Sequence, residues 1–216
     1  MQAPTDTKPR WERRKDARPQ ELLAAALELF VDRGFAATRL EDVARAAGVS
    51  KGTLYLYFEN KQDLFKAVVR DTIVQTIGQA ESDAAAAQDM PSDELLRQML
   101  RTWWTQVGAT KVAGLAKLMM AESGNFPELA QFYNEEVIER GSALLTRILE
   151  RGVARGEFRP LDPVMMTNVL VAPVLTLMMW KHSFFPCETH EGVDADAFMD
   201  TFLGLVQQGL APQKQA

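Results

Sequence analysis

The 216-residue sequence contains a single cysteine, Cys187, so no disulfide can form within the chain and the cysteine content gives no support for secretion. The N-terminus lacks the apolar segment of a signal peptide, and no glycine-rich phosphate-binding loop occurs along the chain. The sequence also lacks a nucleophile–base pair, a carboxylate dyad and a cofactor motif. These absences predict a cytoplasmic protein that is not an enzyme and uses no cofactor.

Long apolar runs are scarce as well. The longest uncharged run, from Pro163 to Trp180, only just reaches the length of a transmembrane helix. It contains Asn168, Pro173 and Thr176, which suit a helix inside a globular domain better than a membrane span. We therefore expect a buried helix here and no membrane partner.

Strand-like alternation of apolar and polar residues is absent, and apolar residues recur at helical spacing instead. The pattern predicts an all-α fold of about nine helices. They are expected to begin near residues 19, 38, 50, 60, 92, 112, 125, 162 and 194. Residues 83–91 form the expected break between an N-terminal and a C-terminal group of helices.

Charge is distributed unevenly along the chain. The net charge of −5 is made of +3 over residues 1–70 and −8 over residues 71–216. Residues 8–18 carry six basic and two acidic side chains, which fits either a solvated, frayed terminus or a basic arm that follows DNA phosphates. We expect a basic flexible arm at 1–17 and a short tail at 212–216.

The N-terminal helices are separated by residues that end or cap helices. Gly34 suits the position just past the first helix, and Thr38 with Glu41 has the form of a capping box. Gly48 permits a sharp turn, and Ser50 can cap the helix that follows. A helix, a tight turn and a second helix form a helix-turn-helix, whose second helix enters the DNA major groove. The pattern alone also fits any small helical hairpin.

The segment from Phe35 to Phe65, FAATRLEDVARAAGVSKGTLYLYFENKQDLF, resembles the DNA-binding domain of TetR-type transcriptional regulators. The resemblance covers about residues 18–66, and residues 67–211 would then bind an inducer and form the dimer. It implies a homodimer on a two-fold symmetric operator, most simply a repressor released by a small apolar ligand. A ligand-independent activator or architectural DNA-binding protein is the alternative.

The resemblance, with the chemistry of the side chains, assigns DNA contacts to hydroxyls, cations and one groove-facing apolar residue. The expected contacts are Thr38, Arg39, Arg45, Ser50, Lys51, Gly52, Thr53, Tyr55, Leu56, Tyr57 and Lys61. Each also has a purely structural interpretation: the tyrosines can pack, Thr38 and Ser50 can cap, and the lysines can be solvated.

The C-terminal part is rich in methionine and tryptophan, which often line apolar pockets of adaptable shape. Core packing is the alternative for each methionine. The expected ligand-binding residues are Trp103, Met119, Met120, Glu122, Phe132, Met166, Asn168 and Met178. Residues 114–137 and the turn at 156–160 resemble a TetR subgroup called AefR-like, which implies no particular ligand.

Two further features remain. The last two helices are apolar enough to suggest a dimer interface, as the resemblance also implies, or else packing within the chain. The expected interface residues are Leu170, Val174, Leu177, Phe198, Phe202 and Leu205. Finally, His182, Cys187 and His190 lie within nine residues, but their spacing fits no known metal motif, so we expect no metal.

Overall fold

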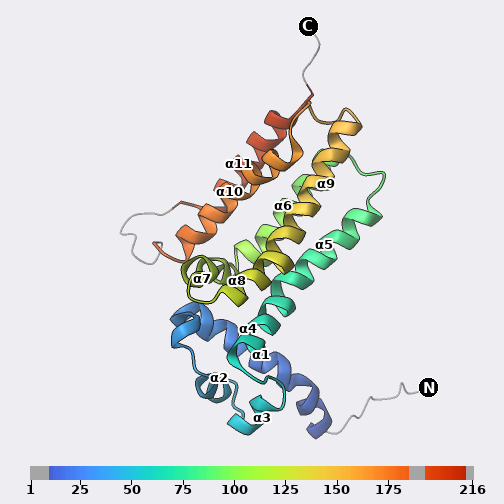
Figure 1. Ribbon diagram of the computed structural model, residues 1–216. Coiled ribbons are helices and arrows are strands. Elements are labelled where there is room, and N and C mark those ends of the chain that lie inside the picture. Colours follow the sequence, from blue (N-terminus) through green and yellow to red (C-terminus); the bar gives the residue numbers. More distant parts are fainter. Residues whose placement is uncertain (1–9, 185–192, 213–216) are drawn as a thin grey trace, which may run out of the picture. The chain divides into compact units, whose positions relative to one another are not determined.

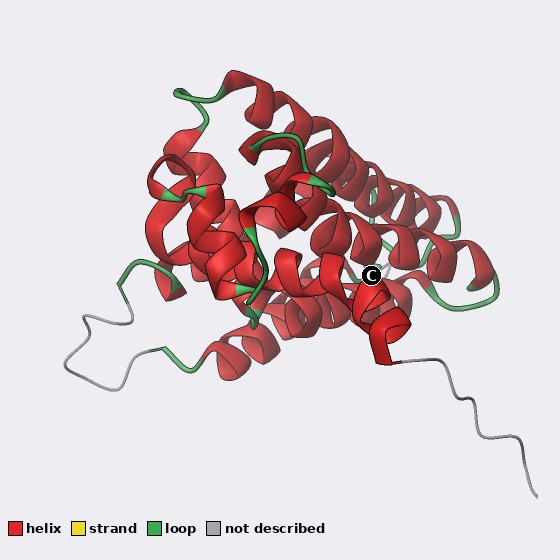
Figure 2. Cartoon of the chain, turned by 90° about the horizontal axis from the view of Figure 1, so that it is seen from below, coloured by secondary structure: helices red, strands yellow, loops and turns green. Residues whose placement is uncertain are grey.

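The computed structural model describes residues 10–184 and 193–212, with side chains from Pro19 onward. Contacts divide the chain into two units, Met1–Val68 and Val69–Ala216. Throughout the described ranges the backbone is helix or loop, without strands (Figure 2). The predicted all-α fold is therefore confirmed, and, with helices that continue through π-helical turns counted once, the described residues form the nine helices expected.

Four helices form the first unit: α1 (Arg10–Ala37), α2 (Leu40–Ala46), α3 (Lys51–Tyr55) and α4 (Lys61–Val69), the last of which crosses the boundary between the units. Helix α1 begins nine residues before the expected start at Pro19, because the polar segment before that proline is also helical. Gly34 interrupts α1 with a φ of 82°, which a residue with a β-carbon rarely adopts. Helix α3 has only five residues and ends at Tyr55.

An aromatic cluster joins the ends of α1 and α4. Phe30, Phe35 and Phe65 are fully or almost fully buried, and their ring centroids lie 5.4–5.6 Å apart. Two of the three contacts are edge-to-face, the arrangement that aromatic quadrupoles favour. Val43 and Leu54 are also buried, so each short helix contributes an apolar side chain to the unit's core.

The second unit contains the remaining α-helices. In chain order they are α5 (Gln75–Ala86), α6 (Ser92–Trp103), α7 (Gly114–Glu122), α8 (Pro127–Tyr133), α9 (Arg140–Ala154), α10 (Pro163–Lys181) and α11 (Ala195–Leu210). Three π-helical segments, at Arg70–Val74, Trp104–Gly108 and Asn134–Glu139, continue or join these helices. Such turns insert a residue into an α-helix and are frequent at functional sites.

Helix α9 lies at the centre of this unit, beside α6 and α10, and α11 lies beside both of the latter (Figure 1). Apolar residues of α6, α9 and α11 form one cluster with Phe158 and Leu170. Arg151 of α9 closes the adjoining loop: its guanidinium donates 3.0 Å hydrogen bonds to the Ser92 hydroxyl and to the carbonyls of Ala87 and Met90. The first residues of the expected break at 83–91 therefore belong to α5, and the residues from Ala87 onward form an ordered connection between α5 and α6.

Helix α10 is not the buried helix that the sequence suggested. It is the one described helix whose length and composition alone would allow a membrane span, yet only 28% of its apolar window is buried. Thr167, Leu170, Val174 and Leu177 face the unit, and the opposite side is exposed. Because α10 is apolar all round, its sequence carries no signal of which side faces inward.

Gly152 of α9 marks a close approach between helix and loop. A β-carbon there would lie 2.1 Å from Cδ2 of the buried Phe158 ring. Gly152→Ala is therefore expected to destabilise the protein by about 2 kcal/mol, because the ring has no free space to enter. Gly141→Ala, in the same helix, is the control: its β-carbon would meet only Cδ1 of Ile77, at 4.0 Å. Urea denaturation should show Gly141→Ala at least as stable as the parent; equal stability of the two variants would contradict this packing.

Candidate nucleic-acid interface and effector-binding unit

The turn between α2 and α3 is built as the helix-turn-helix pattern predicted. Gly48 has a φ of 67°, which reverses the chain after α2. The Ser50 hydroxyl then accepts a 3.1 Å hydrogen bond from the backbone N–H of Thr53, so its predicted role as the N-cap of α3 is confirmed. Leu54 is fully buried and fixes α3 against the unit's core. The side of α3 opposite Leu54 faces solvent.

Several expected DNA contacts lie on that exposed side. Leu56 is 82% exposed, an arrangement that core packing does not explain, and Tyr55 is also exposed. The other exposed members of the set are Arg39, Arg45, Ser50, Lys51 and Gly52. Thr53 and Tyr57 are half-buried, and the Thr53 hydroxyl lies 2.9 Å from that of Ser50. The geometry thus presents a mixed surface of cations, hydroxyls and one large apolar side chain.

The cations on this surface are paired with carboxylates of α2. Lys51 Nζ lies 2.5 Å from Oε1 of Glu41, and an Arg45 nitrogen lies 3.1 Å from Oδ1 of Asp42. The hydrogen bond with Lys51 lowers the pKa of the Glu41 carboxyl, and the same bond raises the pKa of Lys51. Both side chains are therefore charged at neutral pH.

Lys61 does not extend toward solvent as a phosphate contact requires. Its ammonium donates hydrogen bonds to the carbonyls of Phe35 (2.6 Å), Ala36 (3.0 Å) and Thr38 (2.9 Å). The ammonium also lies 4.5 Å from the Phe35 ring centroid. In this structure Lys61 caps the end of α1, where backbone carbonyls lack intrahelical partners. Lys61 thus has a structural role in this structure, and its expected DNA contact stays a prediction.

Thr38 is likewise turned inward. It is 1% exposed, and its hydroxyl is hydrogen-bonded to the carbonyls of Gly34 (2.8 Å) and Leu29 (3.1 Å). The expected capping box is therefore wrong: the N-cap of α2 is Arg39, whose side chain forms no capping bond. The Thr38 hydroxyl is used to hold the bend after Gly34 and is not available to a phosphate.

The expected ligand-binding residues do not form one lining. Met119, Phe132 and Met178 are buried, and Trp103 and Glu122 are half-buried. Met120 is exposed, and Asn168 is exposed with its amide donating to the Val164 carbonyl, so neither faces an interior. Met166 packs on the α6–α9–α11 cluster. The sequence could not show which methionine of an adjacent pair, such as Met119 and Met120, would be buried, because neighbouring residues on a helix face different directions.

His182 lies at the end of α10, and its Nε2 atom is buried. Among the described residues, this is the one buried side-chain nitrogen or oxygen without a hydrogen-bond partner. Burial, reinforced by Lys181, lowers the pKa of His182, so the ring is neutral near pH 7. Such an unpartnered atom in a folded protein calls for an explanation, and sequence reasoning did not single it out. Cys187 and His190 lie outside the described residues, and among those described no group of three metal-binding side chains occurs.

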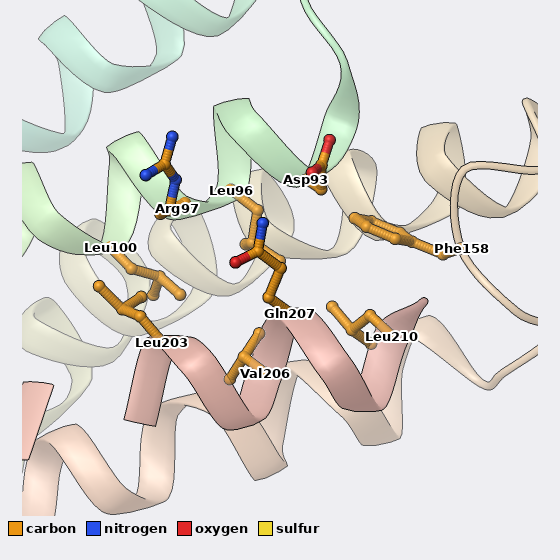
Figure 3. A pocket seen from close by; sticks show the side chains of 9 residues that line it. All are labelled: Asp93, Leu96, Arg97, Leu100, Phe158, Leu203, Val206, Gln207 and Leu210. Carbon is orange, nitrogen blue, oxygen red and sulfur yellow. The ribbon is translucent and has the colours of Figure 1, made fainter. Parts of the chain in front are cut away.

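A small cavity lies between α6 and α11, against Phe158 (Figure 3). Leu96, Leu100 and Leu203 form part of its apolar wall, and Arg97 and Gln207 lie beside it. Its volume of about 10 Å³ is that of roughly one water molecule. It is too small for an effector.

Comparisons with known proteins identify both units. The family described as "Bacterial regulatory proteins, tetR family" matches residues 22–68, and the family described as "Tetracyclin repressor-like, C-terminal domain" matches residues 91–201. The second match alone spans more than half of the chain. The chain belongs to the TetR family. It is accordingly a DNA-binding transcriptional regulator, as the recognition motif implied.

Individual TetR-family proteins are similar to this chain over most of its length. The repressor KstR2 of Rhodococcus jostii is 27% identical over 199 residues, which are 91% of this chain and 93% of KstR2. The fatty acid metabolism regulator protein of Bacillus subtilis is 27% identical over 147 residues, 67% of this chain and 74% of that protein. The crystal structure of FadR from Bacillus subtilis with stearoyl-CoA has a TM-score of 0.68 at 23% identity, over 88% of this chain and 98% of that one.

The dimer residues expected for a TetR-family chain are only partly exposed. Leu170, Val174 and Leu177 are buried within the unit, so they cannot contact a partner, which corrects that prediction. Phe198 and Phe202 are half-buried, and Leu205 is 65% exposed. The outward side of α10 instead carries Val164, Met165, Val169 and Val171. In α10 the exposed apolar side is therefore not the side that carries the expected interface residues.

Proposed function

We propose that this regulator acts in the cytoplasm as a homodimeric repressor, without catalytic activity, that binds a two-fold symmetric operator and is released by an apolar effector. The uncovered apolar side of α10 and α11 carries the proposal. Large exposed apolar surfaces mark interaction sites, and a second copy of the same surface would cover this one. The similarity to the repressor KstR2 supports the direction of regulation.

The dimer surface is defined by uncharged side chains on two helices that pack side by side (Figure 1). On α10 the exposed apolar residues are Val164, Met165, Val169 and Val171, and on α11 Leu205 is exposed together with Ala197 and Thr201. Asn168 and Thr176 are exposed on α10 as well. These polar groups suit a protein interface and are costly in lipid, so we propose a second protomer and not a membrane as the partner.

The operator would be read by the exposed side of α2 and α3. Lys51, Arg39 and Arg45 can bind phosphates, and Leu56 can contact a thymine methyl in the major groove. Tyr55 is exposed enough for its hydroxyl to reach a phosphate. Two copies of α3 would then bind half-sites one helical turn apart, or a multiple of that distance.

The effector would bind among the helices of the second unit. Met119, Phe132 and Met178 supply buried apolar surface there, and the neutral His182 supplies the unpartnered Nε2. Tyr133 is buried too, which raises the pKa of its phenol and keeps it protonated. The stearoyl-CoA bound to FadR and the name of the Bacillus subtilis fatty acid regulator support a fatty-acyl effector.

Stearoyl-CoA is the probe that tests this effector class. It should raise the thermal unfolding midpoint, because a ligand at 100 times its dissociation constant stabilises the bound state by about 2.7 kcal/mol. It should also weaken binding to the DNA that the protein retains from genomic fragments, since the ligand must favour a DNA-incompetent arrangement. Coenzyme A without the acyl chain is the control and should do neither. If stearoyl-CoA and coenzyme A have the same effect, the fatty-acyl assignment is wrong.

A further inference from the structure

Two adjacent carboxylates of α2, Glu41 and Asp42, form ion pairs with two cations of the proposed DNA-binding side, Lys51 and Arg45, and with Arg33 of α1. Glu41 Oε1 lies 2.5 Å from Lys51 Nζ. The two oxygens of Asp42 bind separate arginines, Arg45 at 3.1 Å and Arg33 at 3.6 Å. Each of these three cations therefore has an internal counter-ion before any phosphate arrives.

These ion pairs are open to solvent. The side chains of Lys51, Arg45 and Arg33 are 56%, 77% and 54% exposed, so phosphate oxygens can reach all three. Exposed pairs of this kind contribute little to folding stability, and a better-placed anion can displace them. A phosphate that takes Lys51 from Glu41 nevertheless gains less than one that meets a free lysine, and the released carboxylate repels the DNA.

We propose that Glu41 and Asp42 compete with DNA phosphates for Lys51 and Arg45, and so suppress sequence-independent binding. The two carboxylates act as specificity-determining residues without touching a base. This inference rests on the proposed DNA-binding side of α2 and α3.

The consequence is that cation–phosphate contacts contribute less to the affinity for DNA, and base contacts contribute relatively more. Non-specific binding comes almost entirely from cation–phosphate contacts, and each contact adds about 0.9 to the slope of log K against log salt concentration. An internal counter-ion weakens that contribution on every sequence. Base contacts, such as those of Leu56, are unaffected, so the ratio of specific to non-specific binding rises.

The same two residues also lie in the first turn of α2, where acidic side chains stabilise a helix through its dipole. A purely helix-stabilising role would change the unfolding midpoint and leave the salt dependence of DNA binding unaltered. The salt slope is therefore the measurement that separates competition with phosphate from helix stabilisation.

The test measures binding of the full-length protein to a random-sequence 30-base-pair duplex at several salt concentrations. Glu41→Gln should bind on the order of threefold to tenfold more tightly, with a slope steeper by about one unit, because Lys51 becomes fully available. Glu59→Gln is the matched control: it removes one negative charge near α3, from a side chain that forms no ion pair within the described residues. It should change affinity less than twofold and leave the slope unaltered.

A double-mutant cycle makes the test independent of general charge effects. In a Lys51→Gln background, Glu41→Gln should no longer steepen the slope, since the lysine that it releases is absent. Lys51→Gln alone tests the DNA-binding side itself and should weaken binding. If Glu41→Gln binds no more tightly than Glu59→Gln, or steepens the slope equally with and without Lys51, competition is overturned. A Lys51→Gln variant that binds like the parent would instead overturn the proposed role of Lys51.

Discussion

Replacing Leu205 by lysine is expected to convert the proposed dimer into monomers and to weaken binding to the proposed operator at least a hundredfold. Leu205 is 65% exposed on α11, beside the exposed apolar side of α10, and in the proposed dimer it would be covered. Because a two-fold interface contains every residue twice, one substitution places two uncompensated charges in it. A buried charge without a partner costs about 3 kcal/mol or more. Each half-site would then have to be bound independently, which removes the gain from linkage.

The control is a lysine at another exposed apolar position of the same unit. Ile138 is 51% exposed in the π-helical segment Asn134–Glu139, on neither α10 nor α11. Ile138→Lys should remain dimeric by light scattering and should bind DNA like the parent. A Leu205→Lys protein that keeps twice the mass of the chain at micromolar concentration would show that α11 is not in the interface.

Lys61→Met is expected to lower the free energy of unfolding by about 3 kcal/mol. The side chain keeps its aliphatic length but loses the ammonium that donates to the carbonyls of Phe35, Ala36 and Thr38. Each hydrogen bond from a charged donor contributes about 1.5–3 kcal/mol, and the loss is not additive. Three carbonyls at and just beyond the end of α1 would be left without this donor, and the bend that leads into α2 would loosen.

Lys51→Met is the comparison variant. Substitution of Lys51 is expected to change DNA binding but not stability, and substitution of Lys61 is expected to change stability but not the salt dependence of DNA binding. Lys51 is exposed and pairs only with surface groups, so its loss should leave the stability nearly unchanged but flatten the salt slope of DNA binding by about one unit. Lys61→Met should lower the urea midpoint and keep the parent slope. A stable Lys61→Met protein with a flattened slope would restore Lys61 as a phosphate contact.

The helices and the recognition motif could be predicted because their signals are local. Ser50 caps α3 through a backbone group three residues away, and Gly48 turns the chain by its own conformational freedom. Neither depends on distant parts of the chain. The spacing of apolar residues likewise gave the starts of most helices, although polar residues before Pro19 extended α1 beyond its predicted start.

The direction of individual side chains could not be predicted in this way. Lys61 is drawn to carbonyls more than twenty residues earlier in the chain, a contact that exists only once α1 and α4 have packed. Thr38 also turns inward toward a partner that is not adjacent in the sequence, the carbonyl of Leu29 nine residues earlier. For α10, which is apolar on all sides, only the finished packing decides that Leu170 faces in and Val169 faces out.

The most direct test of the account is a hydroxyl-radical footprint on the DNA that the protein retains from its own genomic fragments. The account predicts an enriched sequence with two-fold symmetry. It also predicts two protected patches on one face of the duplex, separated by about one helical turn of 34–36 Å or a multiple of it. A single patch, or retained DNA without a common sequence, would contradict the claim that two copies of α3 read a symmetric operator.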